Sequence, residues 1–236
     1  MRIVCISDTH LHQNFSIPAG DVLIHAGDGT STGTQREVTR WLTWIAAQPH
    51  RKKIVVAGNH DFLFERDPEL IALLMPDSID YLQDSGTRFR GVKFWGSPWQ
   101  PAFNNWAFNL PRGPQLEEKW ELIPNDTDVL ITHSPPHGIL DRVFPRPSGW
   151  DLESSSGSGP LGCEDLLFRV HALRPQVHVF GHIHDSYGTQ VLGETVFVNA
   201  CICDEDYKPT NPPIVIDLPN KPGVLERRPG RMKPHI

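Results

Sequence analysis

The sequence predicts an α/β fold in which two mixed sheets pack together and helices cover their outer faces. Strand-like apolar segments alternate with amphipathic segments of helical period in the first half of the chain. In the second half, strand-like segments follow one another at short spacing, which favours a second sheet. Five of the strand-like segments also end in residues that commonly bind metals, and this places a site at one edge of the sheets.

The predicted strands are short runs rich in Val and Ile. Such runs are typical of strands buried inside a sheet. In chain order they are Ile3–Ile6, Val22–Ile24, Ile54–Ala57, Lys93–Trp95, Val129–Thr132, Val177–Phe180, Gly188–Leu192, Thr195–Asn199 and Ile214–Asp217.

Four segments have the spacing of amphipathic helices. Gln35–Gln48 carries apolar residues at helical spacing, and Pro68–Met75 begins with a proline, which is favoured in a first helical turn. Gln115–Leu122 follows Pro114, and Glu164–Leu173 carries apolar residues on one face. These helices are expected to cover the outer faces of the two sheets.

Seven side chains at the ends of the strand-like segments have metal-ligand chemistry. They are Asp8, His10, Asp28, Asn59, His133, His182 and His184. Mixed oxygen and nitrogen ligands suit Mn, Fe, Zn, Co or Ni, whereas an all-oxygen set would indicate Mg or Ca. Seven ligands are too many for one tetrahedral ion, but they suit two ions if one carboxylate bridges them. Such ions lie about 3.5–4 Å apart and promote displacement at phosphorus.

The order of these motifs resembles the calcineurin-like metallophosphoesterases. That order is Asp-x-His, Gly-Asp, Gly-Asn-His-Asp, His and Gly-His-x-His. Four segments further resemble the metallophosphoesterase-domain-containing (MPPED) subfamily, which is similar to class III cyclic nucleotide phosphodiesterases. They are Asp21–Asp28, His133–Pro136, Gly181–His184 and Pro209–Pro213. The resemblance implies a four-layer α/β/β/α sandwich.

The resemblance extends from Met1 to about Asp217. We therefore expect one metallophosphoesterase domain over residues 1–218. The remaining residues, 219–236, are rich in Pro, Lys and Arg and are expected to form a peripheral tail.

The resemblance also implies a role for each candidate residue. The first ion is bound by Asp8, His10 and His184, and the second by Asn59, His133 and His182. Asp28 bridges the two ions together with a hydroxide. His60, beside Asn59, binds no metal and protonates the leaving oxygen. The cofactors are two divalent transition-metal ions, with Mn favoured among Mn, Fe, Zn, Co and Ni.

The implied activity is that of a metal-dependent phosphoric ester hydrolase. We expect a phosphodiesterase that acts on cyclic nucleotides or similar small phosphodiesters by in-line attack of the bridging hydroxide. The same metal set serves a phosphomonoesterase or a nucleotide pyrophosphatase equally well. A non-catalytic, protein-binding scaffold of the same fold is the alternative from another class, and it is disfavoured because every ligand position and His60 are filled.

Three positions depart from related patterns. The Gly-Asp-x-x-Asp-Arg-Gly motif of the Ser/Thr protein phosphatases is missing at Gly27–Gly33, which argues against a phosphoprotein substrate and removes the Asp that orients the catalytic His. Gly29 stands where a larger residue is expected, and it either widens the pocket or forms a turn. Cys201 stands where Ser is expected.

Composition limits the range of partners. The 236-residue chain has a net charge of −6, so it lacks a basic nucleic-acid footprint. It has no apolar run near the about 20 residues that span a bilayer, and no signal peptide, so we expect a cytoplasmic protein. Four cysteines are expected to be reduced and structural in that compartment, namely Cys5, Cys163, Cys201 and Cys203.

Two long loops, Ser97–Pro114 and Ser134–Gly162, are candidates for substrate contact. The first is rich in aromatic residues, which either stack on a nucleobase or cover the sheet. Arg112, Arg142 and Arg146 also lie in these loops.

Overall fold

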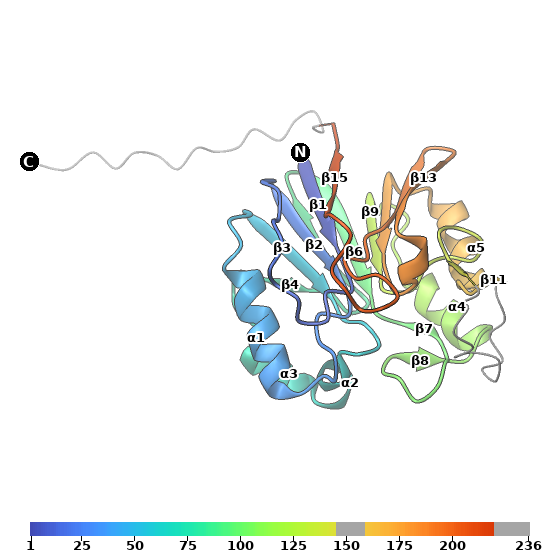
Figure 1. Ribbon diagram of the computed structural model, residues 1–236. Helices are drawn as coiled ribbons and strands as arrows, with labels where there is room; N and C mark the ends of the chain where they lie inside the picture. The colour runs from blue at the N-terminus through green and yellow to red at the C-terminus, as the bar shows by residue number, and fades with distance from the viewer. Residues whose placement is uncertain (145–158, 220–236) are drawn as a thin grey trace, which may run out of the picture.

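The computed structural model describes residues 1–144 and 159–219. Within them, two sheets face each other and helices lie outside both, so the predicted four-layer α/β/β/α architecture is confirmed (Figure 1). The predicted tail lies outside the described residues from position 220 onward. No helix in the described part of the chain is long and apolar enough to cross a membrane.

The first sheet has five strands in the order β15-β1-β2-β3-β4. Four of them run parallel, namely β1 (Arg2–Ile6), β2 (Val22–Ala26), β3 (Lys52–Val56) and β4 (Asp80–Tyr81). β15 (Ile214–Asp217) is antiparallel to β1. The three parallel strands β1, β2 and β3 therefore deliver the segments that follow them to one edge of the sheet.

The second sheet has six strands in the order β13-β14-β12-β9-β6-β5. Its four central strands are parallel, namely β6 (Val92–Ser97), β9 (Val129–Thr132), β12 (Val177–Phe180) and β14 (Thr195–Asn199). β5 (Ser85–Phe89) and β13 (Gly188–Leu192) are antiparallel edge strands. Short pairs join β7 (Gln100–Pro101) to β8 (Asn109–Leu110) and β10 (Arg142–Val143) to β11 (Gly159–Pro160).

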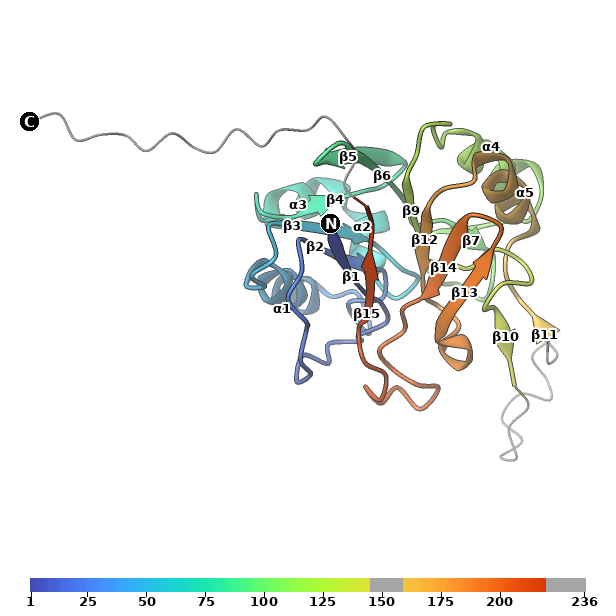
Figure 2. The ribbon, with the colours of Figure 1, turned by 90° about the horizontal axis from the view of Figure 1, so that it is seen from above.

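Helices cover the outer face of each sheet (Figure 2). The first sheet is covered by α1 (Gln35–Ala46), α2 (Phe62–Arg66) and α3 (Pro68–Leu74). The second is covered by α4 (Pro114–Glu121) and α5 (Glu164–Leu173). A single 3₁₀ turn, η1 (His184–Ser186), follows β12.

The alternation of side chains along the strands explains the layers. In β1, Ile3 and Cys5 face the second sheet, whereas Val4 and Ile6 face α1, where Trp41 is fully buried. The second sheet repeats this pattern, because Val129 and Ile131 of β9 face the first sheet and Leu130 faces α4 and α5. Strands buried on both faces read as continuous apolar runs, which is why they were predictable.

Every predicted strand and helix is present, with ends shifted by at most a few residues. α5, β12, β13, β14 and β15 have the predicted bounds, and α1 ends at Ala46 rather than Gln48. The sequence missed α2, β4 and β5, as well as the two-residue strands β7, β8, β10 and β11. The first two are only five and two residues long, and β5 is a half-exposed polar strand, Ser-Gly-Thr-Arg-Phe, without an apolar run.

Candidate active site

The segments after the parallel strands of both sheets meet at one edge. Asp8, just after β1, donates its N–H to the carbonyl of Gly27 after β2 at 2.9 Å. An isolated parallel β-bridge between the backbones of Ser7 and Cys201 joins the two sheets there. This edge therefore collects the seven predicted ligand residues from segments far apart in the sequence.

Asn59, His133 and His182 form one group of potential ligands. The Asn59 Oδ1 atom lies 2.9 Å from His133 Nε2 and 2.8 Å from His182 Nδ1. His133 is fully buried and Asn59 is nearly so. Three donor atoms from the segments after β3, β9 and β12 thus converge. They belong to the residues that the family resemblance implies for the second ion.

Asp8 and His184 form a second group. The Asp8 Oδ1 atom lies 3.3 Å from His184 Nε2. Its other oxygen, Oδ2, accepts hydrogen bonds from the hydroxyl of Ser7 and from the backbone N–H of His182, the latter at 3.0 Å. Oδ1 is therefore the Asp8 oxygen that faces His184.

Asp28 lies between these groups. Its Oδ2 atom is 3.5 Å from His133 Nε2 and 3.9 Å from both His10 Nε2 and His60 Nε2. One oxygen each of Asp8 and Asp28 and one ring nitrogen of His133 lie within 4.8 Å of one another. The position of Asp28 is the one that a bridging carboxylate requires.

The orientation of the imidazoles fits a metal site. The Nδ1–H groups of His10, His133 and His184 donate to the backbone carbonyls of Thr30, Ala26 and Asp204, at 3.2, 3.0 and 2.8 Å. Because each Nδ1 is held by a carbonyl, each Nε2 points to the centre of the site, which is the usual orientation of metal-binding histidines. His10 Nε2 is buried and has no hydrogen-bond partner among the described residues, so it lacks the partner that a cation would provide.

The charges of the site also suit cations. Burial opposes ionisation of Asp8, but the hydrogen bond with His184 and the charge of His133 outweigh it and hold the pKa well below its usual range. Burial lowers the pKa of His10 to about 4 and that of His182 to about 3, so both are neutral donors at neutral pH. Although burial acts in the opposite direction, Asp28 raises the pKa of His133 to about 9, so a cation must displace a proton there.

His60 lies beside these groups and is held by the backbone. Its Nδ1–H donates to the carbonyl of Ser31 at 2.7 Å, and its backbone N–H donates to Asp28 Oδ1 at 2.8 Å. The ring of Trp106 packs 4.2 Å from the His60 ring, centroid to centroid. The backbone carbonyl of Ser31 thus takes the place of the orienting Asp that the sequence lacks.

Asp61 organises the strand ends, a role that the sequence did not assign. Its buried carboxylate accepts hydrogen bonds from the backbone N–H groups of Asp28, Thr30 and Gly58 at 2.9, 2.9 and 2.8 Å. Burial, followed by the charge of Asp28, raises the pKa of Asp61 to about 6. This carboxylate fixes the segment after β2 against the segment after β3.

Gly29 does not widen the pocket. A Cβ atom at Gly29 would overlap the indole of Trp41, so the glycine makes room for a core side chain. At Gly181 a Cβ atom would overlap Ser7 and the carboxylate of Asp8, so the glycine lets the backbone lie close to the site.

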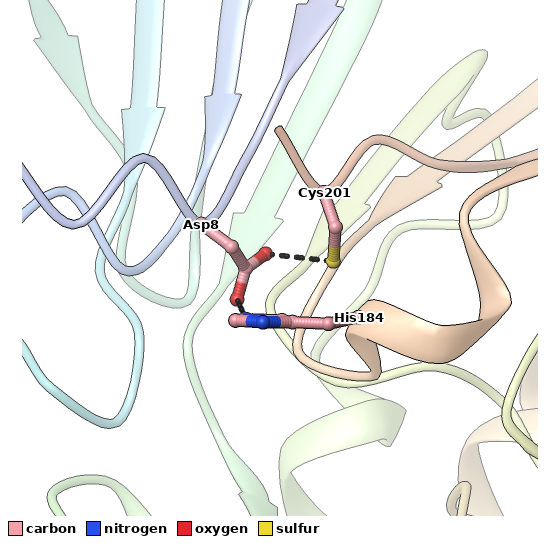
Figure 3. A group of neighbouring side chains, drawn as sticks. All are labelled: Asp8, His184 and Cys201. Carbon is pink, nitrogen blue, oxygen red and sulfur yellow. Dashed lines mark hydrogen bonds and ion pairs between the residues drawn. The ribbon is translucent and has the colours of Figure 1, made fainter. Parts of the chain in front are cut away.

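Cys201 is a site residue that sequence reasoning missed. All four cysteines are buried free thiols, as predicted. However, the Cys201 Sγ–H donates to Asp8 Oδ2 at 3.2 Å, and burial, followed by the charge of Asp8, raises its pKa well above the usual range (Figure 3). Its position after β14 matches the strand-end pattern of the candidate ligands.

The aromatic loop residues divide into two kinds. Trp99 and Phe108 pack in the core. Trp106 instead lies against His60, and Tyr207, which is 48% exposed, lies 4.7 Å from the His10 ring. Arg146 lies outside the described residues.

Arg112 does not contact the candidate site. Its guanidinium pairs with Glu164 and donates to the carbonyls of Leu161 and Gly162, each at 2.8 Å.

Comparisons with known proteins agree with this fold. The calcineurin-like phosphoesterase family matches residues 1–186. Metallophosphoesterase domain-containing protein 1 of Homo sapiens is 44% identical over 242 residues, which cover 92% of this chain and 71% of that protein. UPF0046 protein K07C11.7 of Caenorhabditis elegans is 39% identical over 236 residues, covering 94% of this chain and 76% of that protein. A crystal structure 16% identical in sequence has a TM-score of 0.61 and covers 84% of this chain and 89% of that chain, so the two share the fold.

Proposed function

Because this chain belongs to the calcineurin-like phosphoesterase family, we propose that it is a two-metal phosphodiesterase acting on small phosphodiesters, cyclic nucleotides among them. The observation that carries the proposal is the convergence of six oxygen and nitrogen donors around the Asp28 carboxylate. Two divalent transition-metal ions, with Mn favoured, would activate the nucleophile and neutralise charge at phosphorus.

The proposed ligands divide into two sets on either side of Asp28. Asp8, His10 and His184 hold one ion, and Asn59, His133 and His182 hold the other. The carbonyls of Thr30, Ala26 and Asp204 keep the Nδ1 protons in place, so the rings need no reorientation to bind. This preorganisation supports a resident metal centre rather than an accidental cluster of histidines.

His60 is the proposed acid for the leaving oxygen. The carbonyl of Ser31 fixes its Nδ1–H, so Nε2 is the atom that faces Asp28 and the centre of the site. A proton carried on Nε2 would be transferred to the departing alkoxide and would also stabilise negative charge at phosphorus.

The surroundings of the site favour a diester over a monoester. A monoester carries nearly two negative charges at neutral pH, and sites for such groups commonly use an arginine clamp. Arg112 is held by Glu164 and by two backbone carbonyls, so it is not available for this role. A diester carries one negative charge, so its binding requires less positive charge beyond that of the two metal ions.

Two aromatic residues flank the proposed metal ligands. The ring of Trp106 packs 4.2 Å from His60, while Tyr207 packs 4.7 Å from His10 and 5.3 Å from His184. Aromatic faces beside a phosphoester site suit a flat substituent such as a nucleobase. This arrangement supports cyclic nucleotides as substrates. We expect them to be turned over slowly, with a preference for the 2′,3′-cyclic forms.

A turnover screen with added Mn tests the proposal. It compares bis-nitrophenyl phosphate with nitrophenyl phosphate, and 2′,3′-cyclic with 3′,5′-cyclic nucleotides. We expect bis-nitrophenyl phosphate to have a higher kcat/KM than nitrophenyl phosphate. A preference for the monoester of about tenfold or more with Mn, Co and Ni would replace the phosphodiesterase with a phosphomonoesterase.

A further inference from the structure

Cys201 occupies a fixed position where the two sheets meet. It follows β14 and forms a parallel bridge with Ser7, which follows β1. The backbone N–H of Ile202 donates to the carbonyl of Ser7 at 2.9 Å. Because backbone hydrogen bonds join these segments, the Cys201 side chain is held beside the Asp8 carboxylate.

The thiol belongs to a compact set of potential metal donors. Cys201 Sγ lies 3.2 Å from Asp8 Oδ2, and His184 Nε2 lies 3.3 Å from Asp8 Oδ1. In Figure 3 dashed lines join the Asp8 carboxylate to both the sulfur and the imidazole, and one donor atom of each residue lies within 4.8 Å of the others. Separations of this size suit ligands bound at about 2.0–2.3 Å to a common ion.

An independent observation points to a cation at the same end of the site. His10 is only 6% exposed, and its Nε2 has no hydrogen-bond partner among the described residues. Its ring lies 5.4 Å from the ring of His184. A buried, unpartnered acceptor beside this set requires a positively charged or hydrogen-bonding group.

A purely structural role explains Cys201 poorly. Asp8 Oδ2 already accepts hydrogen bonds from the Ser7 hydroxyl and the His182 N–H, so its need for donors is met without the thiol. Cys203 provides the contrast, because its sulfur contacts a backbone carbonyl, that of Thr9, at 3.8 Å.

We propose that Cys201 is a sulfur ligand of the ion held by Asp8, His10 and His184, and that the sulfur shifts the metal preference of this position from Mn towards Zn, Co or Fe. The inference rests on the proposed two-metal centre. On binding, the S–H bond breaks, the proton passes to solvent and a metal–sulfur bond forms, with no change in oxidation state. Thiolate ligands favour these softer ions, so the sulfur changes which metal this position selects.

The test replaces the metals of the full chain with Co²⁺ and compares the native protein with Cys201→Ser and the matched control Cys203→Ser. The native protein and the control should show near-ultraviolet sulfur-to-cobalt charge-transfer absorption. Cys201→Ser should lose that absorption while retaining the visible Co²⁺ bands. In competition dialysis it should also lose about tenfold of its preference for Zn over Mn, equivalent to about 1.4 kcal/mol.

A measurement on the native chain alone guards against misfolding of the variant. X-ray absorption of the Zn-loaded protein should show a sulfur scatterer at about 2.3 Å. Two bound ions with no sulfur scatterer, or charge-transfer absorption that persists in Cys201→Ser, would overturn the role of Cys201 and leave the metal centre intact. Fewer than two bound ions and no turnover of any phosphoester would instead remove the proposed function, and the sulfur ligand with it.

Discussion

His60 Nδ1 lies 2.7 Å from the backbone carbonyl oxygen of Ser31, to which it donates a hydrogen bond. Ser31 belongs to the segment that follows Asp28, so the proposed bridging ligand and the support of the proposed acid lie on one short stretch of chain. A carbonyl carries no net charge, unlike the carboxylate of the protein phosphatases. It fixes the ring without adding negative charge beside a phosphate anion.

His60→Ala is expected to keep both metal ions and to slow turnover of alkyl diesters by roughly 10²–10⁴-fold, the usual contribution of a general acid. Metal analysis and kcat measurements check both parts. The loss should shrink for nitrophenyl esters, because that leaving group departs without a proton. His137→Ala, which removes an imidazole paired with Glu164 instead, serves as the control. Equal losses for alkyl and nitrophenyl leaving groups would exclude the acid role.

Gly29→Ala is expected to destabilise the fold by about 1–3 kcal/mol, because the new methyl group overlaps the buried Trp41 indole. Urea unfolding measures the change. The cost should fall when the same substitution is made in a Trp41→Leu background, since the two positions share one space. Gly159→Ala, whose Cβ would have no described atom within 4 Å, should change stability by less than about 0.5 kcal/mol. An unchanged stability with a raised KM would instead place Gly29 in the substrate pocket.

His178 is expected to weaken the fold in acid. Burial lowers its pKa from 6.5 to about 3, so the unfolded chain binds a proton that the folded chain does not. Its contribution is therefore complete above pH 6.5 and is lost as the pH falls towards 3.

The measurement is urea unfolding of the metal-free chain between pH 6 and pH 4.5. His178→Gln keeps a donor for Thr132 and should reduce the slope of unfolding free energy against pH by about 1.4 kcal/mol per pH unit. His171→Gln alters an exposed residue of α5 and is the control. If His178→Gln and the native chain have the same slope, the imidazole is protonated in the folded state.

The sequence predicted the strands, and it pointed to the candidate ligands that follow them, because both leave local signals. A strand buried on both faces requires an apolar run, as at Val129, Leu130 and Ile131 of β9, and the candidate ligand His133 stands directly after that strand. The geometry of parallel strands then places such residues together without further information.

Other features could not be predicted because they depend on contacts between distant segments. The carbonyl that holds His60 is a backbone group, and Ser31 has no side-chain signature for this role. Cys201 contacts Asp8 across 193 positions of sequence. The five-residue helix α2 is too short for a periodic pattern.

In the proposed mechanism, Asp28 bridges two metal ions in one reaction centre. The most direct measurement is metal stoichiometry and diester turnover of the chelator-treated chain after reloading with Mn, compared between the native protein and Asp28→Asn. The exposed Asp126→Asn serves as the control, because Asp126 pairs with Arg88 and Lys93 at the surface.

The native protein and Asp126→Asn should each bind two Mn ions per chain and show full turnover. Asp28→Asn should bind one ion or fewer and lose activity, since an amide is a poor bridge between two cations. Two tightly bound ions together with near-native turnover in Asp28→Asn would contradict the claim.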